Sequence, residues 1–198
     1  MGIVEPGTSG ERIPITILTG FLGSGKTTLM NHILNGDHGL RAAVLVNDFG
    51  AINIDAQLIV GVEGEMVNLA NGCICCTIRG DLLAAVQNLV SLDEPPEYIL
   101  IEASGVSNPA QVAYTFTDAS LRDHTLVDSI LTVIDAEQFE AIDKKHRKLA
   151  QEQVDSADIV IINKVDLATV DQIASLRAWI RRRVPQARIL ETNFARIP

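Results

Sequence analysis

One stretch of eight residues constrains the fold of this chain more than any other. Residues 20–27 read GFLGSGKT and fit the pattern G-x-x-x-x-G-K-[ST] without a mismatch. Glycines let such a loop curl until its backbone N–H groups point inward at phosphate oxygens. An apolar run, Ile15–Thr19, precedes the loop, and a helical pattern begins near Lys26. The stretch therefore predicts a phosphate-binding loop between a strand and a helix, whose positive N-terminal end adds to the anion site.

The residues of this loop have different expected roles in binding a nucleoside triphosphate. Lys26 is expected to reach the β- and γ-phosphates, and the Thr27 hydroxyl to ligate Mg²⁺. The backbone and side chains expected to contact the nucleotide here are those of Gly20, Gly23, Ser24, Gly25, Lys26, Thr27 and Thr28.

Short apolar runs alternate with helical stretches along the rest of the chain. The expected strands are Ile15–Thr19, Ala42–Val46, Tyr98–Glu102, Ser129–Ile134, Ile159–Ile162 and Arg188–Leu190. The expected helices lie near 26–35, 80–91, 147–156 and 170–183, with a further helix start at Asn108-Pro109. This alternation predicts an α/β fold of the P-loop NTPase kind: a doubly wound, mainly parallel sheet with helices on both faces. Residues 1–12 are expected to be a flexible N-terminal tail, and residues 13–198 one domain.

Composition excludes several classes of protein. Of the 198 residues, 47% are hydrophobic, as in a folded globular chain, and the formal net charge of −9 argues against general nucleic-acid binding. No apolar run approaches the ~20 residues of a membrane span, and residues 1–6 lack the features of a signal peptide. We therefore expect a cytoplasmic protein with no nucleic-acid or membrane partner.

Acidic residues follow two of the expected strands. Glu102 ends the run 98–102, on the ligand side of a parallel sheet, where it can hold Mg²⁺ as a Walker-B acid does. The alternative is a helix-capping or salt-bridged carboxylate. Gly105 is expected to give a backbone N–H to the γ-phosphate. Asp135 also follows a strand, but Asp135–Gln138 reads as a capping pattern, and we favour the cap.

A second motif predicts which base is bound. Residues 163–166 read NKVD after the buried strand 159–162. The Asp166 carboxylate can accept from guanine N1–H and from the exocyclic amine, and adenine has neither donor at that edge. Asn163 can donate to O6 or N7, and the stem of Lys164 can pack along the base or the phosphate loop. The order of the two motifs predicts GTP as the ligand. Residues 191–193 follow the last strand and are candidates for completing the base pocket.

The segment after the second expected strand resembles a nucleotide-sensing switch. Residues 47–55 read NDFGAINID, with carboxylates at Asp48 and Asp55 on the ligand side. Asp48 is a candidate for sensing the γ-phosphate or orienting the attacking water, and an ordinary strand-to-helix loop is the alternative. Together, Lys26, Asp48 and Glu102 are the catalytic candidates.

The three cysteines of the chain lie within four residues, at Cys73, Cys75 and Cys76. An odd number at so short a spacing is unlike a disulfide framework and is typical of free thiols in a reducing compartment. Thiolates this close together can supply two or three soft ligands to one metal ion. In an extended segment Cys73 and Cys75 share a face and Cys76 does not, so that use of all three needs a kink. A group of small buried residues is the alternative.

Taken together, these motifs resemble those of the CobW-like metallochaperone GTPases, relatives of the nickel-insertion GTPases UreG and HypB. The matching stretches are Ile15–Leu29, Asn47–Asp55, Asn71–Cys76, Glu102–Gly105 and Asn163–Asp166, which span most of the chain. The C-x-C-C sequence is the most specific of them. Two departures are that the family usually has Glu where Asp48 stands, and usually carries a second, C-terminal domain that this chain is expected to lack.

The resemblance implies a slow GTPase with bound Mg²⁺, Zn²⁺ or Co²⁺ at the three cysteines, and GTP-dependent delivery of that metal to a client metalloprotein. The partners are then GTP or GDP and the client, with the oligomeric state open between a monomer and a homodimer. Two other classes remain: a P-loop kinase or other NTPase of small-molecule metabolism, and a non-catalytic metal-storage module.

Overall fold

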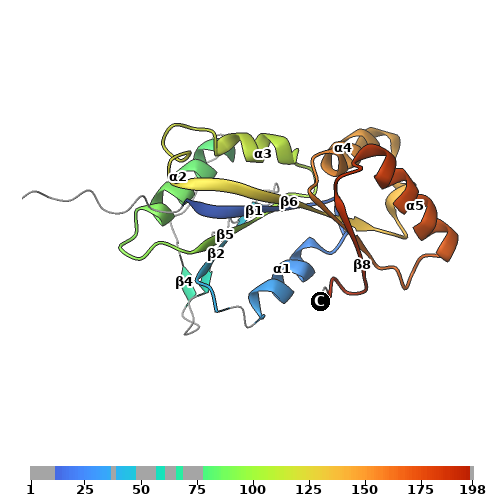
Figure 1. Ribbon diagram of the computed structural model, residues 1–198, viewed down its shortest axis with the longest axis horizontal. Coiled ribbons are helices and arrows are strands. Elements are labelled where there is room, and N and C mark those ends of the chain that lie inside the picture. Colours follow the sequence, from blue (N-terminus) through green and yellow to red (C-terminus); the bar gives the residue numbers. More distant parts are fainter. Residues whose placement is uncertain (1–11, 37–38, 48–56, 61–65, 69–77, 197–198) are drawn as a thin grey trace, which may run out of the picture.

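The computed structural model describes residues 12–36, 39–47, 57–60, 66–68 and 78–196 of the chain. Within these residues one sheet of eight strands runs through the molecule, in the order β4-β3-β2-β5-β1-β6-β7-β8 (Figure 1). Six of the strands are parallel to one another. They are β1 (Ile13–Thr19), β2 (Ala42–Asn47), β5 (Tyr98–Ala103), β6 (Thr125–Asp135), β7 (Ile159–Asn163) and β8 (Arg188–Thr192). All six expected strands are confirmed, and β6 begins four residues earlier than expected.

The sequence did not predict the other two strands. β3 (Gln57–Val60) pairs antiparallel with β2, and β4 (Met66–Asn68) pairs antiparallel with β3. They extend the sheet beyond β2 at one edge. Strands of four and three residues are too short to show a period of two, and their stability depends on the edge of β2.

Helices cover both faces of the sheet, as expected. The described helices are α1 (Lys26–Leu34), α2 (Ile78–Val90), α3 (Pro109–Thr115), α4 (Lys144–Asp155), α5 (Val170–Arg183) and the short 3₁₀ helix η1 (Phe139–Ala141). Figure 1 shows α2, α3, α4 and α5 on one side of the sheet and α1 on the other. The expected start at Asn108 is confirmed, because its side chain accepts from the Ala110 N–H at 2.9 Å.

Successive residues of the buried strands face opposite layers, and this alternation builds the core. Ile15 and Ile17 of β1 pack with α2 and α3, whereas Leu18 packs with Leu29 of α1. Ile161 of β7 also faces the α1 layer, and its neighbours in β7 pack against α4 and α5. Strands covered on both faces are expected to be apolar throughout, which explains why the parallel strands could be predicted from the sequence.

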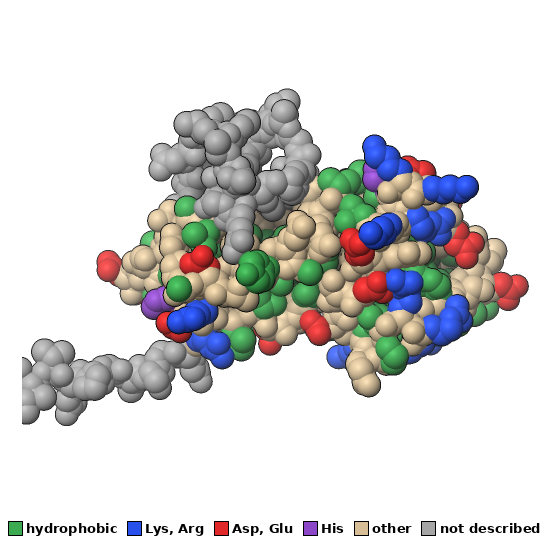
Figure 2. Space-filling model, turned by 90° about the horizontal axis from the view of Figure 1, so that it is seen from above, with side chains coloured by type: hydrophobic (Ala, Val, Ile, Leu, Met, Phe, Trp, Pro, Cys, Tyr) green, Lys and Arg blue, Asp and Glu red, His purple; other side chains and the backbone are tan. Residues whose placement is uncertain are grey.

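The charged side chains are distributed unevenly. Lys and Arg side chains gather over the end of the molecule formed by α4 and α5 (Figure 2). They come from the exposed start of α4 and from the run Arg181–Arg183 that ends α5. Basic residues at the C-terminal end of a helix interact favourably with its dipole, and those at Arg181–Arg183 fit this explanation. None of the described helices is long and apolar enough to cross a membrane.

Candidate nucleotide-binding site

The carboxyl ends of the parallel strands form one edge of the sheet, and the expected site residues follow them there. The phosphate-binding loop, residues 20–27, leaves β1 and enters α1. Its glycines are required by both conformation and space: Gly20 has φ 136° and Gly25 has φ 105°. A Cβ on Gly20 would lie 2.1 Å from the Val133 carbonyl oxygen, and one on Gly25 would lie 2.3 Å from Asn163 Nδ2. The loop is therefore packed tightly against β6 and β7.

Lys26 is largely buried within this loop. Its side chain is 7% exposed, and Nζ donates to the Phe21 carbonyl oxygen at 3.3 Å. The ammonium group thus lies over the loop, where a phosphate chain would be bound. Ser24 Oγ is also buried, and among the described residues it has no hydrogen-bond partner.

The two residues expected to hold Mg²⁺ are in direct contact. Glu102, near the end of β5, pairs in register with Leu18 of β1, which brings its carboxylate beside the start of α1. The Thr27 hydroxyl donates to Glu102 Oε1 at 2.7 Å. Glu102 is 6% exposed, and its other oxygen, Oε2, has no hydrogen-bond partner in the part of the chain that the structure describes. A buried carboxylate oxygen of this kind is a suitable ligand for a hard cation.

A tight turn after β5 lies directly on the phosphate-binding loop. The Ser107 N–H donates to the Ser104 carbonyl oxygen at 2.9 Å, which closes the turn Ser104–Ser107 around Gly105. A Cβ on Gly105 would lie 2.8 Å from the backbone nitrogen of Leu22. Glycine is therefore needed here for close approach, and the turn stands where the sequence predicts a sensor of the γ-phosphate.

Asn163 connects the base motif to the phosphate-binding loop. Its side chain is buried, with 2% exposure; Nδ2 donates to the Ser24 carbonyl oxygen at 2.9 Å, and Oδ1 accepts from the Ala195 N–H at 2.9 Å. The expected contact of Asn163 with guanine O6 or N7 remains a prediction. In the described structure its amide joins three loops that come from β1, β7 and β8.

Lys164 and Asp166 complete the motif. Lys164 Nζ forms an ion pair with Asp135 Oδ2 at 2.7 Å, which directs the lysine side chain back toward the end of β6. Asp166 is exposed, and its backbone N–H donates to Asn193 Oδ1 at 3.1 Å. Asp166 is therefore open to solvent while its backbone is held by the loop after β8.

The loops around the base motif carry backbone strain. Within the described residues, only Lys164, Phe194 and Ala195 have a positive φ without being glycine, at 60°, 53° and 54°. Such conformations cost of order 1–2 kcal/mol per residue and persist where the surroundings enforce them. Phe194 is 68% exposed beside Asn193. The residues expected to finish the base pocket, 191–193, thus lie next to Asp166, and Phe194 extends that group.

Two features that matter here, an ion pair of Asp135 and the buried Gln153, were not predicted from the sequence. The Asp135 cap is confirmed, since Oδ1 accepts from the N–H groups of Glu137 and Gln138 at 3.0 and 3.1 Å, but its ion pair with Lys164 was not predicted. Its position at the end of a parallel strand was the available signal. No sequence pattern predicts a role for Gln153, a fully buried glutamine of α4.

The remaining expected site residues lie outside the described part of the chain. These are Asp48 and Asp55 of the switch-like segment and the thiols Cys73, Cys75 and Cys76, together with the tail at residues 1–11. Within the described residues there is no group of three or more His, Cys, Asp or Glu side chains that could hold a metal ion.

Comparison with known proteins matches most of the described chain to one family model. The family model described as "CobW/HypB/UreG, nucleotide-binding domain" matches residues 14–191. Zinc-regulated GTPase metalloprotein activator 1 of Dictyostelium discoideum is 37% identical over 225 residues, aligning 95% of this chain and 47% of that protein. Zinc chaperone YjiA of Escherichia coli is 36% identical over 179 residues, aligning 87% of this chain and 56% of that protein.

Solved structures of proteins of this kind are also similar to the chain. The Zn(II)-bound YjiA GTPase from E. coli aligns with a TM-score of 0.66 and 33% identity, over 91% of this chain and 57% of that one. The hydrogenase maturation factor HypB from Archaeoglobus fulgidus aligns with a TM-score of 0.55 over 91% of this chain and 80% of that one; at 18% identity it supports the fold alone. The chain spans about half the length of the curated relatives it matches.

Proposed function

Because this chain belongs to the CobW/HypB/UreG nucleotide-binding domain family, we propose that it binds and hydrolyses GTP and uses the nucleotide to control a metal site. The observation that carries the proposal is the bond from Asn163 to Ser24, 139 residues apart in the sequence. It holds the base motif and the phosphate-binding loop in one unit. A nucleotide with its phosphates on residues 20–27 can therefore present its base to Asp166.

Magnesium is the proposed partner of the phosphates. Thr27 and Glu102 would hold it, because both present oxygen atoms at the start of α1 and Glu102 Oε2 has no hydrogen-bond partner among the described residues. The donor set suits Mg²⁺, which prefers hard oxygen ligands. When bound, the ion supplies neutralisation of charge on the β- and γ-phosphate oxygens.

Guanine specificity rests on Asp166. Its exposed carboxylate can accept from two guanine donors that adenine lacks. The loop after β8, held to it by Asn193, provides backbone groups and the Phe194 ring near the same place.

For hydrolysis we propose that Lys26 stabilises the developing charge on the γ-phosphate. Either Asp48 or Glu102 orients the attacking water, or the γ-phosphate itself accepts its proton. Hydrolysis is proposed to be slow, as the family resemblance implies.

The test of the nucleotide proposal is a comparison of GTP and ATP turnover. The wild-type chain with Mg²⁺ should hydrolyse GTP in clear preference to ATP, and Lys26→Ala should abolish the activity. Equal turnover of both nucleotides would instead favour a P-loop kinase or another NTPase of small-molecule metabolism.

The metal proposal rests on the cysteines and on the relatives. Proteins named zinc chaperones and a zinc-regulated GTPase metalloprotein activator are similar to most of this chain. We propose that Cys73, Cys75 and Cys76 bind Zn²⁺ or Co²⁺ as cargo, and that GTP orders both this segment and residues 47–55. Hydrolysis then releases the metal to a client metalloprotein.

This coupling is tested by measuring Zn²⁺ and Co²⁺ affinity with GDP and with a non-hydrolysable GTP analogue. Tighter metal binding with the analogue is expected, and it should disappear when all three cysteines are changed to serine. Equal affinities in the two nucleotide states would remove the coupling. Metal binding without any GTP turnover would indicate a storage module.

A further inference from the structure

We propose that Gln153 of α4 is a positioning residue that sets the γ-phosphate sensor, the turn Ser104–Ser107, against the phosphate-binding loop. This inference rests on the proposed GTPase function and adds to it a residue that touches neither nucleotide nor metal. It also makes α4 part of the machinery that distinguishes GTP from GDP.

The turn itself has little freedom on the side of the phosphate-binding loop. Ser107 donates to the Ser104 carbonyl oxygen twice, from its N–H at 2.9 Å and from its hydroxyl at 2.8 Å. Gly105 approaches Leu22 so closely that a Cβ would lie 2.6 Å from the Leu22 Cδ2 atom. A small displacement of Gly105 therefore changes its position relative to the phosphates.

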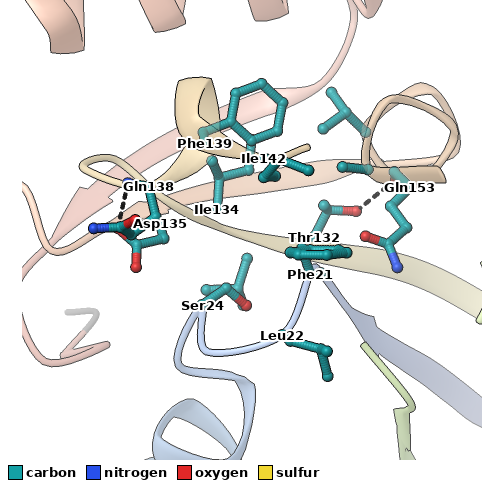
Figure 3. A pocket seen from close by; sticks show the side chains of 14 residues that line it. Phe21, Leu22, Ser24, Thr132, Ile134, Asp135, Gln138, Phe139, Ile142 and Gln153 are labelled. Atoms are coloured by element: carbon teal, nitrogen blue, oxygen red, sulfur yellow. Dashed lines mark hydrogen bonds between the residues drawn. The ribbon is translucent and has the colours of Figure 1, made fainter. Parts of the chain in front are cut away.

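Gln153 holds the turn through its side-chain amide. Its Nε2 donates to the Gly105 and Ser107 carbonyl oxygens, both at 3.1 Å. An amide nitrogen has two hydrogens, so both donors are used on the turn. The backbone carbonyl of Gln153 accepts from Thr132 Oγ1 at 2.8 Å, which fixes this part of α4 to β6 (Figure 3).

The burial of Gln153 in an apolar core indicates that its amide N–H groups serve to hold the turn Ser104–Ser107. The side chain is 1% exposed, and its neighbours in α4, Ala150 and Val154, belong to an apolar core. Its Oε1 atom is buried and has no hydrogen-bond partner among the described residues. A buried amide with an unsatisfied oxygen is costly, and packing alone would be better served by leucine or methionine. The two bonds to the turn are what an apolar side chain cannot supply.

Gln153 also lies close to the phosphate-binding loop. Together with Phe21, Ser24 and Thr132 it lines a small cavity behind that loop, and Figure 3 shows its amide group directed toward the Phe21 ring. In the proposed GTP state the γ-phosphate would accept a hydrogen bond from the Gly105 N–H, and GDP has no γ-phosphate. Gln153 should therefore contribute to binding of the triphosphate and to hydrolysis, and little to binding of the diphosphate.

The experiment compares Gln153→Leu, which removes the donors, with Gln153→Glu, which keeps the shape but replaces the amide by an acceptor. Gln151→Leu, a half-buried position on the same helix, is the matched control. Affinities for GDP and for a non-hydrolysable GTP analogue are measured for each protein, with kcat and KM for GTP. Both Gln153 variants should lose at least ~10-fold in the preference for the analogue over GDP and in kcat, because two hydrogen bonds are lost. GDP affinity should stay within ~2-fold, which also shows that each variant is folded.

The inference would be overturned if both variants kept kcat and the preference for the analogue over GDP unchanged. It would also be overturned by an equal loss of affinity for GDP and for the analogue, because Gln153 would then be a general packing residue. If one variant does not bind GDP because it fails to fold, the other decides. Failure of the wild-type chain to hydrolyse GTP would contradict the proposed function, and the preference for the analogue would still test Gln153 separately.

Discussion

At the scale of single residues, most polar side chains of the site are bound to the protein itself. Asn163 uses its amide on Ser24 and Ala195, and Lys164 is paired with Asp135. Only Asp166 of this motif presents an exposed carboxylate. Because Asn163 and Lys164 already make these contacts, this part of the site needs little rearrangement when a nucleotide binds, which favours affinity.

The exposed carboxylate gives the first prediction. Asp166→Asn should weaken GTP binding by about 10- to 100-fold, because an amide cannot accept from both guanine donors. Xanthine carries a carbonyl in place of the exocyclic amine, so the variant should gain affinity for XTP. Competition binding with both nucleotides measures the exchange. Asp171→Asn, another exposed aspartate, serves as the control and should leave the preference for GTP unchanged.

Asp135 gives the second prediction, because two variants separate its two roles. Asp135→Asn keeps an oxygen for the N–H groups of Glu137 and Gln138 but loses the charge beside Lys164, so it should mainly weaken GTP binding. Asp135→Ala loses both roles and should also lower the free energy of unfolding by about 1–2 kcal/mol. Denaturant unfolding and GTP titration of the two proteins measure the difference. Equal stability of the two variants would show that the cap contributes nothing.

At the scale of elements, the parallel strands and the local motifs could be predicted, and distant contacts could not. Strands buried on both faces are apolar throughout, and the phosphate loop and the Asn163–Asp166 motif are contiguous in sequence. β3 has only four residues, and its pairing needs the edge of β2. Gln153 and the Asp135–Lys164 pair depend on how helices and strand ends pack. No local pattern encodes such packing.

The start of α5 shows a reciprocal cap that supports the base motif just before it. Gln172 N–H donates to Thr169 Oγ1 at 3.2 Å, and Thr169 N–H donates to Gln172 Oε1 at 2.8 Å. Thr169→Ala should therefore destabilise the protein by about 1 kcal/mol, whereas Thr169→Ser should preserve the cap. Urea unfolding of the three proteins is the measurement. Identical midpoints for the alanine and serine variants would contradict the role of the cap.

At the scale of the whole molecule, the candidate nucleotide site joins five adjacent strands of the eight-stranded sheet. The candidate site takes residues from the ends of β1, β5, β6, β7 and β8, so a nucleotide bound as proposed would contact elements that follow all five strands. Binding to the folded state alone then stabilises the domain as a unit.

Thermal unfolding measures this effect. GDP with Mg²⁺ at ~100 times its Kd should add about 2.7 kcal/mol, which corresponds to a rise in Tm of roughly 5–10 °C for a domain of this size. ADP should give no comparable rise, and Lys26→Ala should reduce the response to GDP. A similar shift with both nucleotides would contradict guanine specificity.

The central position of β1 has a consequence for how the chain is made. β1 is the earliest strand in the sequence, yet both of its neighbours come much later: Thr16 bonds to Ser129, 113 residues away. A ribosome would release the phosphate-binding loop long before its surroundings exist, and contacts of such sequence separation form slowly. A nascent chain should therefore be unable to hold nucleotide until Asn163 has emerged, and during that interval the apolar β1 lacks its partner strands and is exposed to aggregation.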